Sequence, residues 1–182
     1  MKGNRAALVA IAAIALLVAG WWLFTRGGAA TAIDLIEQFD AAEKRPAGGS
    51  FTVEEVDLNG ETRRAINAQP PTRITWKVRV PDDAWLKVAV GLKPEAWTQE
   101  GNGVLFLVGV SDGRTFDELF TQHVSPFTNA GDRRWIPVWV DLSAYAGEEV
   151  DLIFNTRTSP AGQGDDPRHD LAVWGAPEVV VR

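Results

Sequence analysis

The residues whose types and spacing come closest to a catalytic pattern begin at Gly109, where Gly-Val-Ser-Asp-Gly matches the G-x-S-x-G pattern of serine hydrolases. Ser111 would be the nucleophile, and His123 or His169 with Asp165 would have to activate it. Such a nucleophile needs a strand, a sharp turn and a helix within a parallel sheet. The flanking residues instead favour antiparallel strands, and Ser-Asp-Gly is an ordinary β-turn sequence. We therefore expect no enzymatic activity, and a serine hydrolase using Ser111 is only the third hypothesis for function.

A second group of reactive side chains lies in the polar stretch 157–170, which ends in Asp-Asp-Pro-Arg-His-Asp. Clustered carboxylates in a loop are ligands that calcium prefers, although the spacing fits no EF-hand. Because Arg168 can neutralise the neighbouring acids, we expect a solvated loop without a cofactor. Structural calcium bound by Asp165, Asp166 and Asp170 is the alternative. The chain has no cysteine, which excludes disulfides and cysteine-rich zinc sites.

Carbohydrate recognition requires an exposed aromatic ring beside side chains that hydrogen-bond to sugar hydroxyl groups. Trp97, in the polar loop 93–103, is the first candidate, and Trp85, on the solvated face of its strand, is the second. The side chains that can supply hydrogen bonds are Arg133, Arg134, Gln163 and His169. Aromatic residues and arginine are also enriched at protein–protein interfaces, so a carbohydrate and a protein partner both stay open.

Charge is unevenly distributed along the chain. The formal net charge is −6, from 18 basic and 24 acidic residues. Three of the basic residues precede the first acid, so the rest of the chain holds 15 basic against all 24 acidic residues, a formal charge of −9. Such a body repels phosphate backbones, so we expect no nucleic acid partner.

Residues 6–24 form an uncharged run of 19 residues near the N-terminus. At about 1.5 Å rise per residue, the run nearly matches the ~30 Å hydrocarbon core of a bilayer. Trp21 and Trp22 lie at its end, where aromatic rings favour the headgroup layer. More positive charge precedes the run than follows it, so we predict a single-pass anchor in the cell membrane with a cytoplasmic N-terminus and an extracytoplasmic body. A signal peptide cleaved after Ala32 is the alternative.

The segment between the anchor and the body predicts a short helix. We divide the chain into an anchor, residues 1–27, a linker with this helix, residues 28–49, and a body, residues 50–182. Apolar residues recur near helical spacing over 33–44, with acids in the first turn and bases in the last. This amphipathic juxtamembrane helix would pack on the body, lie along the membrane or dock on a partner.

Residues 50–182 have the pattern of an antiparallel β-sandwich. Short runs alternate between apolar and polar residues, as strands do when one face lies in a core. No βα alternation is present, and Asn59-Gly60 is a strong hairpin signal. The expected strands are 51–58, 61–67, 73–80, 84–92, 104–108, 135–141, 149–156, 171–174 and 178–181, while 115–122 is ambiguous between a strand and a helical turn.

The stretch 135–147 predicts a strand that ends in a compact corner, Asp-Leu-Ser-Ala-Tyr-Ala-Gly. We expect Ser143 to cap a single helical turn and Gly147 to end that turn in the left-handed conformation. We expect the Tyr145 hydroxyl to bond to backbone.

Several of these stretches occur together in one known group of proteins. They are Val-Pro at 80–81, the runs 84–92 and 102–110, Arg-Trp at 134–135 with the corner 140–147, the strand 150–156 and Ala-Val-Trp-Gly-Ala-Pro at 172–177. In this combination, residues 70–182 resemble the galactose-binding-domain-like jelly rolls of carbohydrate-binding modules and of extracytoplasmic parts of bacterial membrane proteins. The resemblance implies an all-β jelly-roll fold. It implies no single function, because that fold hosts sugar binding, lipid binding and scaffolding.

Together the patterns predict a single-pass membrane protein with an extracytoplasmic jelly-roll domain. Our first hypothesis is a non-enzymatic accessory or scaffold subunit of a membrane protein complex, which contacts other membrane subunits through the anchor and the 33–44 helix. The alternative is a membrane-tethered carbohydrate-binding module. A sugar binder usually accompanies a catalytic domain, and this chain shows none, so the first hypothesis is preferred.

Overall fold

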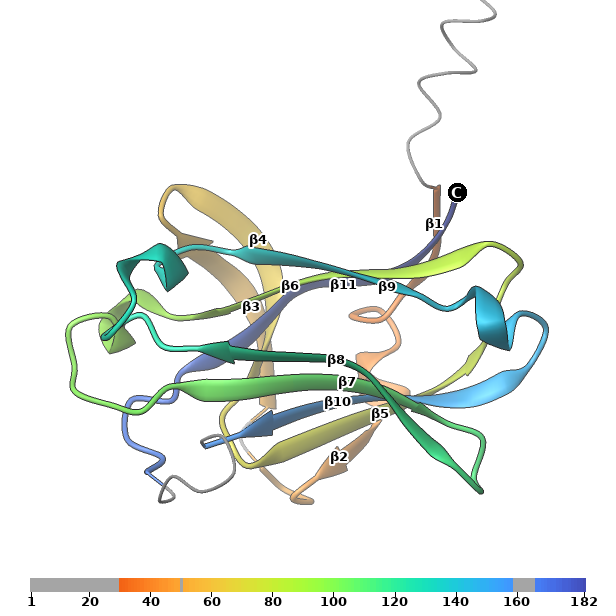
Figure 1. Cartoon of the computed structure of the whole chain (residues 1–182), viewed down its shortest axis with the longest axis horizontal. Helices are drawn as coiled ribbons and strands as arrows, with labels where there is room; N and C mark the ends of the chain where they lie inside the picture. The colour runs from red at the N-terminus through yellow and green to blue at the C-terminus, as the bar shows by residue number, and fades with distance from the viewer. Residues whose placement is uncertain (1–29, 50, 159–165) are drawn as a thin grey trace, which may run out of the picture. The chain divides into compact units, whose positions relative to one another are not determined.

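The computed structural model describes residues 30–49, 51–158 and 166–182, which form two antiparallel sheets that face each other (Figure 1). Sheet A has the order β3 (Phe51–Leu58), β4 (Glu61–Ala68), β11 (Ala172–Val181), β6 (Ala84–Leu92), β9 (Ile136–Asp141), and β1 (Ala30–Asp34) pairs with β11. Sheet B has the order β2 (Glu43–Arg45), β5 (Thr72–Arg79), β10 (Glu149–Arg157), β7 (Val104–Ser111), β8 (Phe116–Val124). Short 3-10 turns are η1 (Phe39–Ala41), η2 (Pro94–Ala96), η3 (Ala130–Asp132) and η4 (Ser143–Tyr145).

This architecture confirms the predicted jelly-roll sandwich. Residues 116–122 of the ambiguous segment 115–122 belong to strand β8, and the two predicted closing strands are one bulged strand, β11. None of the helices in the described part of the chain is long and apolar enough to cross a membrane. The predicted anchor, residues 6–24, lies outside the described residues, so it stays a prediction.

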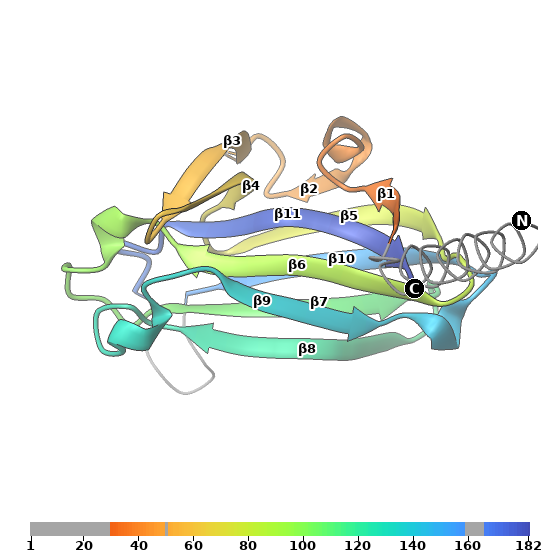
Figure 2. The same cartoon turned by 90° about the horizontal axis from the view of Figure 1, so that it is seen from above.

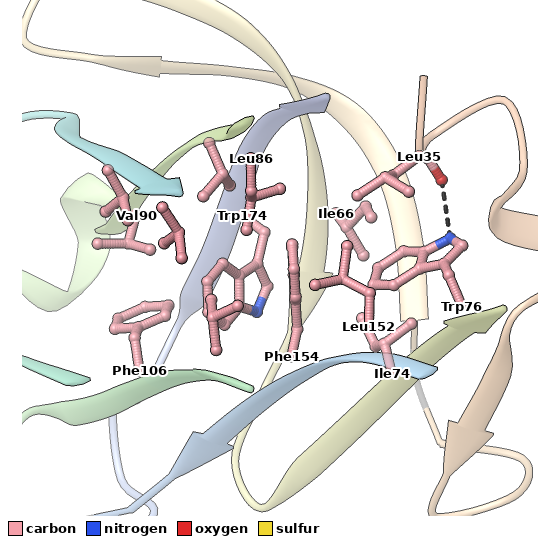
Figure 3. Packing of buried hydrophobic residues seen from close by; sticks show 14 of the residues in the cluster. Leu35, Ile66, Ile74, Trp76, Leu86, Val90, Phe106, Leu152, Phe154 and Trp174 are labelled. Atoms are coloured by element: carbon pink, nitrogen blue, oxygen red, sulfur yellow. Dashed lines mark hydrogen bonds between the residues drawn. The ribbon is translucent and has the colours of Figure 1, made fainter. Parts of the chain in front are cut away.

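The core between the sheets is built around four aromatic side chains from four strands (Figure 3). Trp76, Phe154, Trp174 and Phe106 follow one another with ring centroids 4.9, 4.5 and 5.0 Å apart. Each is at most 2% exposed. Tilted and edge-to-face pairs of this kind add about 0.5–1.5 kcal/mol each beyond the area they bury. The core therefore fixes the strands whose ends carry the loops.

The short helix predicted over 33–44 is absent, and that prediction was wrong. These residues form the end of β1, the turn η1 and the start of β2, which pairs with β5 at the edge of sheet B. Leu35 is fully buried, and its carbonyl accepts a hydrogen bond from Nε1 of Trp76 at 3.0 Å (Figure 3). Ile36 and Phe39 are buried as well. The near-helical spacing of apolar residues therefore comes from a turn that covers the core.

The corner at the end of β9 keeps the predicted turn but uses other hydrogen bonds. Gly147 has a φ of 76°, as expected for a residue that ends the turn. The cap is different: Oδ1 of Asp141 accepts from the backbone N–H of Ser143 at 2.9 Å. The Tyr145 hydroxyl donates to Oδ2 of Asp117 at 2.9 Å rather than to backbone. Carboxylates are stronger acceptors than the hydroxyl and carbonyl groups that we had expected.

A second, smaller apolar cluster lies outside the main core and joins β9 to the β3–β4 hairpin, which lies at one edge of sheet A (Figure 2). Trp135, 3% exposed, is its largest member, and Nε1 of Trp135 donates to the carbonyl of Glu61 at 2.9 Å. Its ring lies over Gly175, where an added Cβ would sit 2.7 Å from Cζ3. The other members are Val56, Leu58, Ala65, Ala89 and Val173, with Trp97 packed against them. This outer cluster fixes the start of β9.

Candidate functional site

Three connections between strands meet at one end of the sandwich, which we call the loop end (Figure 1). They are residues 93–103 between β6 and β7, residues 125–135 between β8 and β9, and residues 166–171 before β11. A narrow crevice separates them, with space for about one water molecule. Its lining comes from all three connections: Leu92, Ala96, Gln99, Gly101, Gly103, Ser125, Pro126, Phe127, Arg168, His169 and Asp170.

Two glycines allow the loops to approach this closely. A Cβ on Gly103 would lie 2.5 Å from the carbonyl oxygen of Val124, and the φ of Gly103 is +78°. A Cβ on Gly101 would lie 3.2 Å from the carbonyl oxygen of Arg168. Larger residues at these positions would push the loops apart.

The loop 125–135 is held in one shape by its own side chains. Oδ2 of Asp132 accepts from the backbone N–H of Ser125 at 2.9 Å. The Arg133 guanidinium donates to the carbonyl of Pro126 at 3.0 Å and to the carbonyl of Trp97 at 3.2 Å. Arg133 therefore joins two of the three loops, and these two are positioned before any ligand arrives.

The two tryptophans singled out from the sequence lie apart. Trp97 is at the loop end, but it is half-buried: its ring packs on the outer cluster and its Nε1 donates to the carbonyl of Leu92 at 2.8 Å. Trp85 projects from the outer face of sheet A, opposite Asp141 of β9. Trp139 lies on the same face and is 42% exposed. Trp97 thus supports the loop end, and Trp85 belongs to another surface.

Phe127 is the exposed aromatic ring of the loop end, and it was not among the residues predicted from the sequence. Its side chain is 42% exposed and lines the crevice beside Gln99, Arg168 and His169, all of which are exposed. We call Phe127 and these three side chains the loop-end rim. The signal was available, because Ser-Pro-Phe-Thr-Asn places a large apolar residue among turn formers, where no strand can bury it.

The remaining polar residues predicted from the sequence do not all lie at the rim. His169 belongs to the rim, and its φ of 64° is a backbone conformation that non-glycine residues adopt infrequently. Arg134 is exposed, and its Nε donates to the carbonyl of Gly131 at 3.1 Å within its own loop. Gln163 lies outside the described residues.

Asp170 is the one buried acid of the crevice among its described lining residues. It is 3% exposed, and its Oδ2 has no hydrogen-bond partner among the described residues. Burial, and to a smaller extent the charge of Asp166, raise the pKa of Asp170 to about 7. The carboxyl is therefore largely protonated in mildly acidic solution and charged in alkaline solution.

The aspartates proposed as calcium ligands are not assembled into a site among the described residues, which contain no cluster of three or more acidic, histidine or cysteine side chains suited to a metal. Both carboxylate oxygens of Asp166 accept from Arg168, at 2.7 and 2.6 Å, and this pairing lowers the pKa of Asp166 to about 2. Asp165 lies outside the described residues. The solvated loop without a cofactor stays a prediction.

Ser111 does not have the surroundings of a hydrolase nucleophile. It ends β7 at the hairpin to β8, and its hydroxyl donates to the carbonyl of Thr115 at 2.7 Å. In the β7–β8 ladder Ser111 pairs with Phe116, whereas His123 pairs with Leu105 at the other end. Six residues of strand separate the two positions, roughly 20 Å. The G-x-S-x-G match is therefore a hairpin turn, and no serine–histidine pair forms there.

Comparison with known proteins yields one relative in sequence. No family model matches the chain. An uncharacterized protein of Archaeoglobus fulgidus is 38% identical over 105 residues, which are 57% of this chain and 25% of that protein. The chain thus spans about a quarter of the length of the curated relative that it matches.

Solved structures share the fold. The structure of the M60 catalytic domain with the CBM51-1 and CBM51-2 domains of Clostridium perfringens ZmpB has a TM-score of 0.55 at 18% identity, over 76% of this chain and 14% of that one. TmCBM61 in complex with β-1,4-galactotriose has a TM-score of 0.52 at 10% identity, over 84% of this chain and 99% of that one. At such identities the likeness establishes the fold, which is the jelly-roll sandwich of carbohydrate-binding modules.

Proposed function

We propose that this chain is a non-catalytic carbohydrate-binding module, tethered at the extracytoplasmic face of a membrane by residues 6–24, which binds sugar at the loop end. The observation that carries the proposal is the loop-end rim. There an exposed phenylalanine lies beside glutamine, arginine and histidine side chains contributed by three separate loops. An aromatic face suits the apolar C–H face of a sugar, and the polar groups suit its hydroxyls.

Preorganisation of the loops supports the same function. The hydrogen bonds of Asp132 and Arg133 fix the loop that carries Phe127, so binding needs little ordering of the chain. The fold agrees, because solved carbohydrate-binding modules share it, one of them with bound β-1,4-galactotriose. Fold alone assigns no ligand, so the rim is what makes the proposal specific.

The accessory-subunit hypothesis relied on the anchor and on a docking helix over 33–44. Those residues form strands and a turn, and Leu35, Ile36 and Phe39 are already buried in the sandwich. One of the two elements expected to contact other membrane subunits is therefore absent, and the other, the anchor, lies outside the described residues. The carbohydrate-binding alternative becomes the better supported of the two.

The test is a glycan array probed with the full-length chain in mild detergent, alongside Phe127→Ala and Phe116→Ala. Phe116 is the matched control because it is also an exposed phenylalanine, at 50%, and lies at the far end of the sandwich, beside the Ser111 turn. We expect wild type and Phe116→Ala to bind the same glycans, and Phe127→Ala to bind roughly fivefold to tenfold more weakly. Absence of glycan binding by the wild type, or full binding by Phe127→Ala, would defeat the proposal.

A further inference from the structure

Three arginine side chains project from neighbouring strands of sheet B near the loop end. Arg45 of β2 lies directly opposite Arg73 of β5, and Arg73 lies directly opposite Asn155 of β10. Arg157 comes two residues after Asn155, so it projects from the same outer face. The three arginines are exposed and line an open pocket of about 280 Å³, which we call the arginine pocket. Its other lining residues are Pro46, Pro71, Thr72, Asn155 and Thr156.

Asn155 sets the direction of the central arginine. Its side chain is only 7% exposed, and its Oδ1 accepts a hydrogen bond from Nε of Arg73 at 2.9 Å. This bond uses one of the five guanidinium donors and leaves the terminal N–H groups for a ligand. Within the described part of the chain, no carboxylate forms an ion pair with Arg73 or Arg157.

Arg45 has the one carboxylate that pairs with this group in the described chain, Glu43, at 2.7 Å. Both side chains are well exposed, at 66% and 60%, so the pair is weak and exchanges easily for another anion. Among the described residues, the arginine pocket therefore keeps an excess of positive charge.

Folding gives no reason for this arrangement of charge. Like charges directly opposite one another destabilise strand pairing, and Arg45 and Arg73 form such a pair. Charged residues do protect edge strands from aggregation, but only β2 is an edge strand, since β5 and β10 are paired on both sides. The cluster also contrasts with the acidic composition of the chain, whose formal net charge is −6.

We propose that the arginine pocket binds the anionic group of an acidic glycan, a carboxylate or a sulfate ester, and so makes the module selective for acidic sugars. A guanidinium presents paired donors that match two oxygens of either group. The pocket is slightly smaller than the ~300–1,000 Å³ of sites for drug-sized ligands, which suits one sugar unit. This inference rests on the proposed carbohydrate-binding function.

One oligosaccharide can reach both regions. Arg157 pairs with Leu105 of β7, which is two residues from Gly103 of the loop-end crevice. Two residues of strand span about 7 Å, and neighbouring strands lie about 4.8 Å apart, so Arg157 and Gly103 are separated by roughly 8 Å, more than the length of one sugar ring. An oligosaccharide with its acidic unit in the arginine pocket can therefore extend toward the loop-end crevice with its following units.

The test is calorimetric titration of the full-length chain in mild detergent with trigalacturonate and with the neutral β-1,4-galactotriose. The variants are Arg73→Ala, Arg157→Ala and Arg73→Lys. The matched control is Arg79→Ala, an exposed arginine on the same face of β5, six residues away. We expect trigalacturonate to bind more tightly than galactotriose, and each alanine variant to weaken it about tenfold. Arg73→Lys should keep only part of the wild-type affinity for trigalacturonate, because lysine lacks the paired donors. Arg79→Ala should leave this affinity unchanged.

Further arms separate the remaining outcomes. A further probe is galactotriose that carries a sulfate ester. If it binds more tightly than neutral galactotriose and this gain depends on Arg73, the pocket recognises sulfate. If it binds no more tightly than neutral galactotriose while trigalacturonate does, the pocket recognises carboxylate. Equal binding of acidic and neutral sugars, unchanged in the arginine variants but weakened in Phe127→Ala, would overturn this inference and leave the proposed function standing. Arg73-dependent binding of anionic lipid vesicles without any oligosaccharide binding would overturn both.

Discussion

Replacing Asp170 by asparagine is expected to stabilise the domain at neutral and alkaline pH. Burial first, and then the charge of Asp166, raise the pKa of Asp170 from 3.8 to about 7. In the unfolded chain the pKa returns to its ordinary value, so between about pH 4 and pH 7 the folded state binds one more proton than the unfolded state. The stability contributed by this group therefore falls as pH rises through that range, and the loss is complete above the folded-state pKa.

The magnitude follows from the size of the pKa change. A change from 3.8 to about 7 corresponds to about 4 kcal/mol, at ~1.36 kcal/mol per unit. Because Asp170 lines a crevice at the surface, solvent screens part of this effect, and we expect about 2 kcal/mol. Asparagine keeps the shape of the side chain and removes its charge. The free energy of unfolding of Asp170→Asn should therefore be about 2 kcal/mol higher than that of wild type at pH 8, and close to that of wild type at pH 4.

Urea denaturation of wild type and Asp170→Asn at several pH values between 4 and 8.5 measures this difference. Asp82→Asn, which removes an exposed carboxylate from the β5–β6 turn, controls for the change in net charge. A difference in unfolding free energy between wild type and Asp170→Asn that does not grow with pH would contradict this expectation. A wild type that is more stable than the variant at pH 8 would mean that the ionised carboxylate is held by a cation or a donor.

Four shorter predictions concern other parts of the chain. Gly175→Ala should destabilise the domain by about 1–3 kcal/mol in urea, because its Cβ would meet the Trp135 ring; an unchanged midpoint would contradict the outer cluster. Trp135→Phe should lower the free energy of unfolding by about 1 kcal/mol or more, because it removes the hydrogen bond from Nε1 to the carbonyl of Glu61. A variant as stable as wild type would contradict the importance of this bond. Wild type and Ser111→Ala should both fail to hydrolyse p-nitrophenyl acetate above background, and Ser111-dependent turnover would revive the hydrolase. The melting temperature should be the same in calcium and in EDTA, and a rise in calcium that Asp166→Asn abolishes would place a metal on this loop.

Most strands were predictable because one face of each is buried. In β5, Ile74, Trp76 and Val78 face the core and alternate with solvated residues, which is the period-two signal itself. The Asn59-Gly60 hairpin was equally local, since both residues have positive φ, 59° and 86°, as a type I′ turn requires. Where buried and solvated residues alternate along a strand, the sequence alone is sufficient to predict that strand.

The segment 33–44 shows where such reasoning ends. Its buried residues are spaced like a helix face, but they are buried because a turn lies across the end of the core and bonds to Trp76, 41 positions away. The candidate site has the same difficulty. Phe127, Gln99 and His169 come together only through the order of strands in the two sheets, and no local pattern encodes that order.

Hydrogen–deuterium exchange of the full-length chain, with and without the glycan that binds most strongly on the array, tests the location of the site directly. Carbohydrate binding at the loop end predicts protection of the backbone amides in 93–103, 125–135 and 166–171, since ligand contact there suppresses local opening. It predicts no protection around Trp85 and Trp139 on the outer face of sheet A. Protection confined to that outer face, or no protection anywhere, would contradict the account.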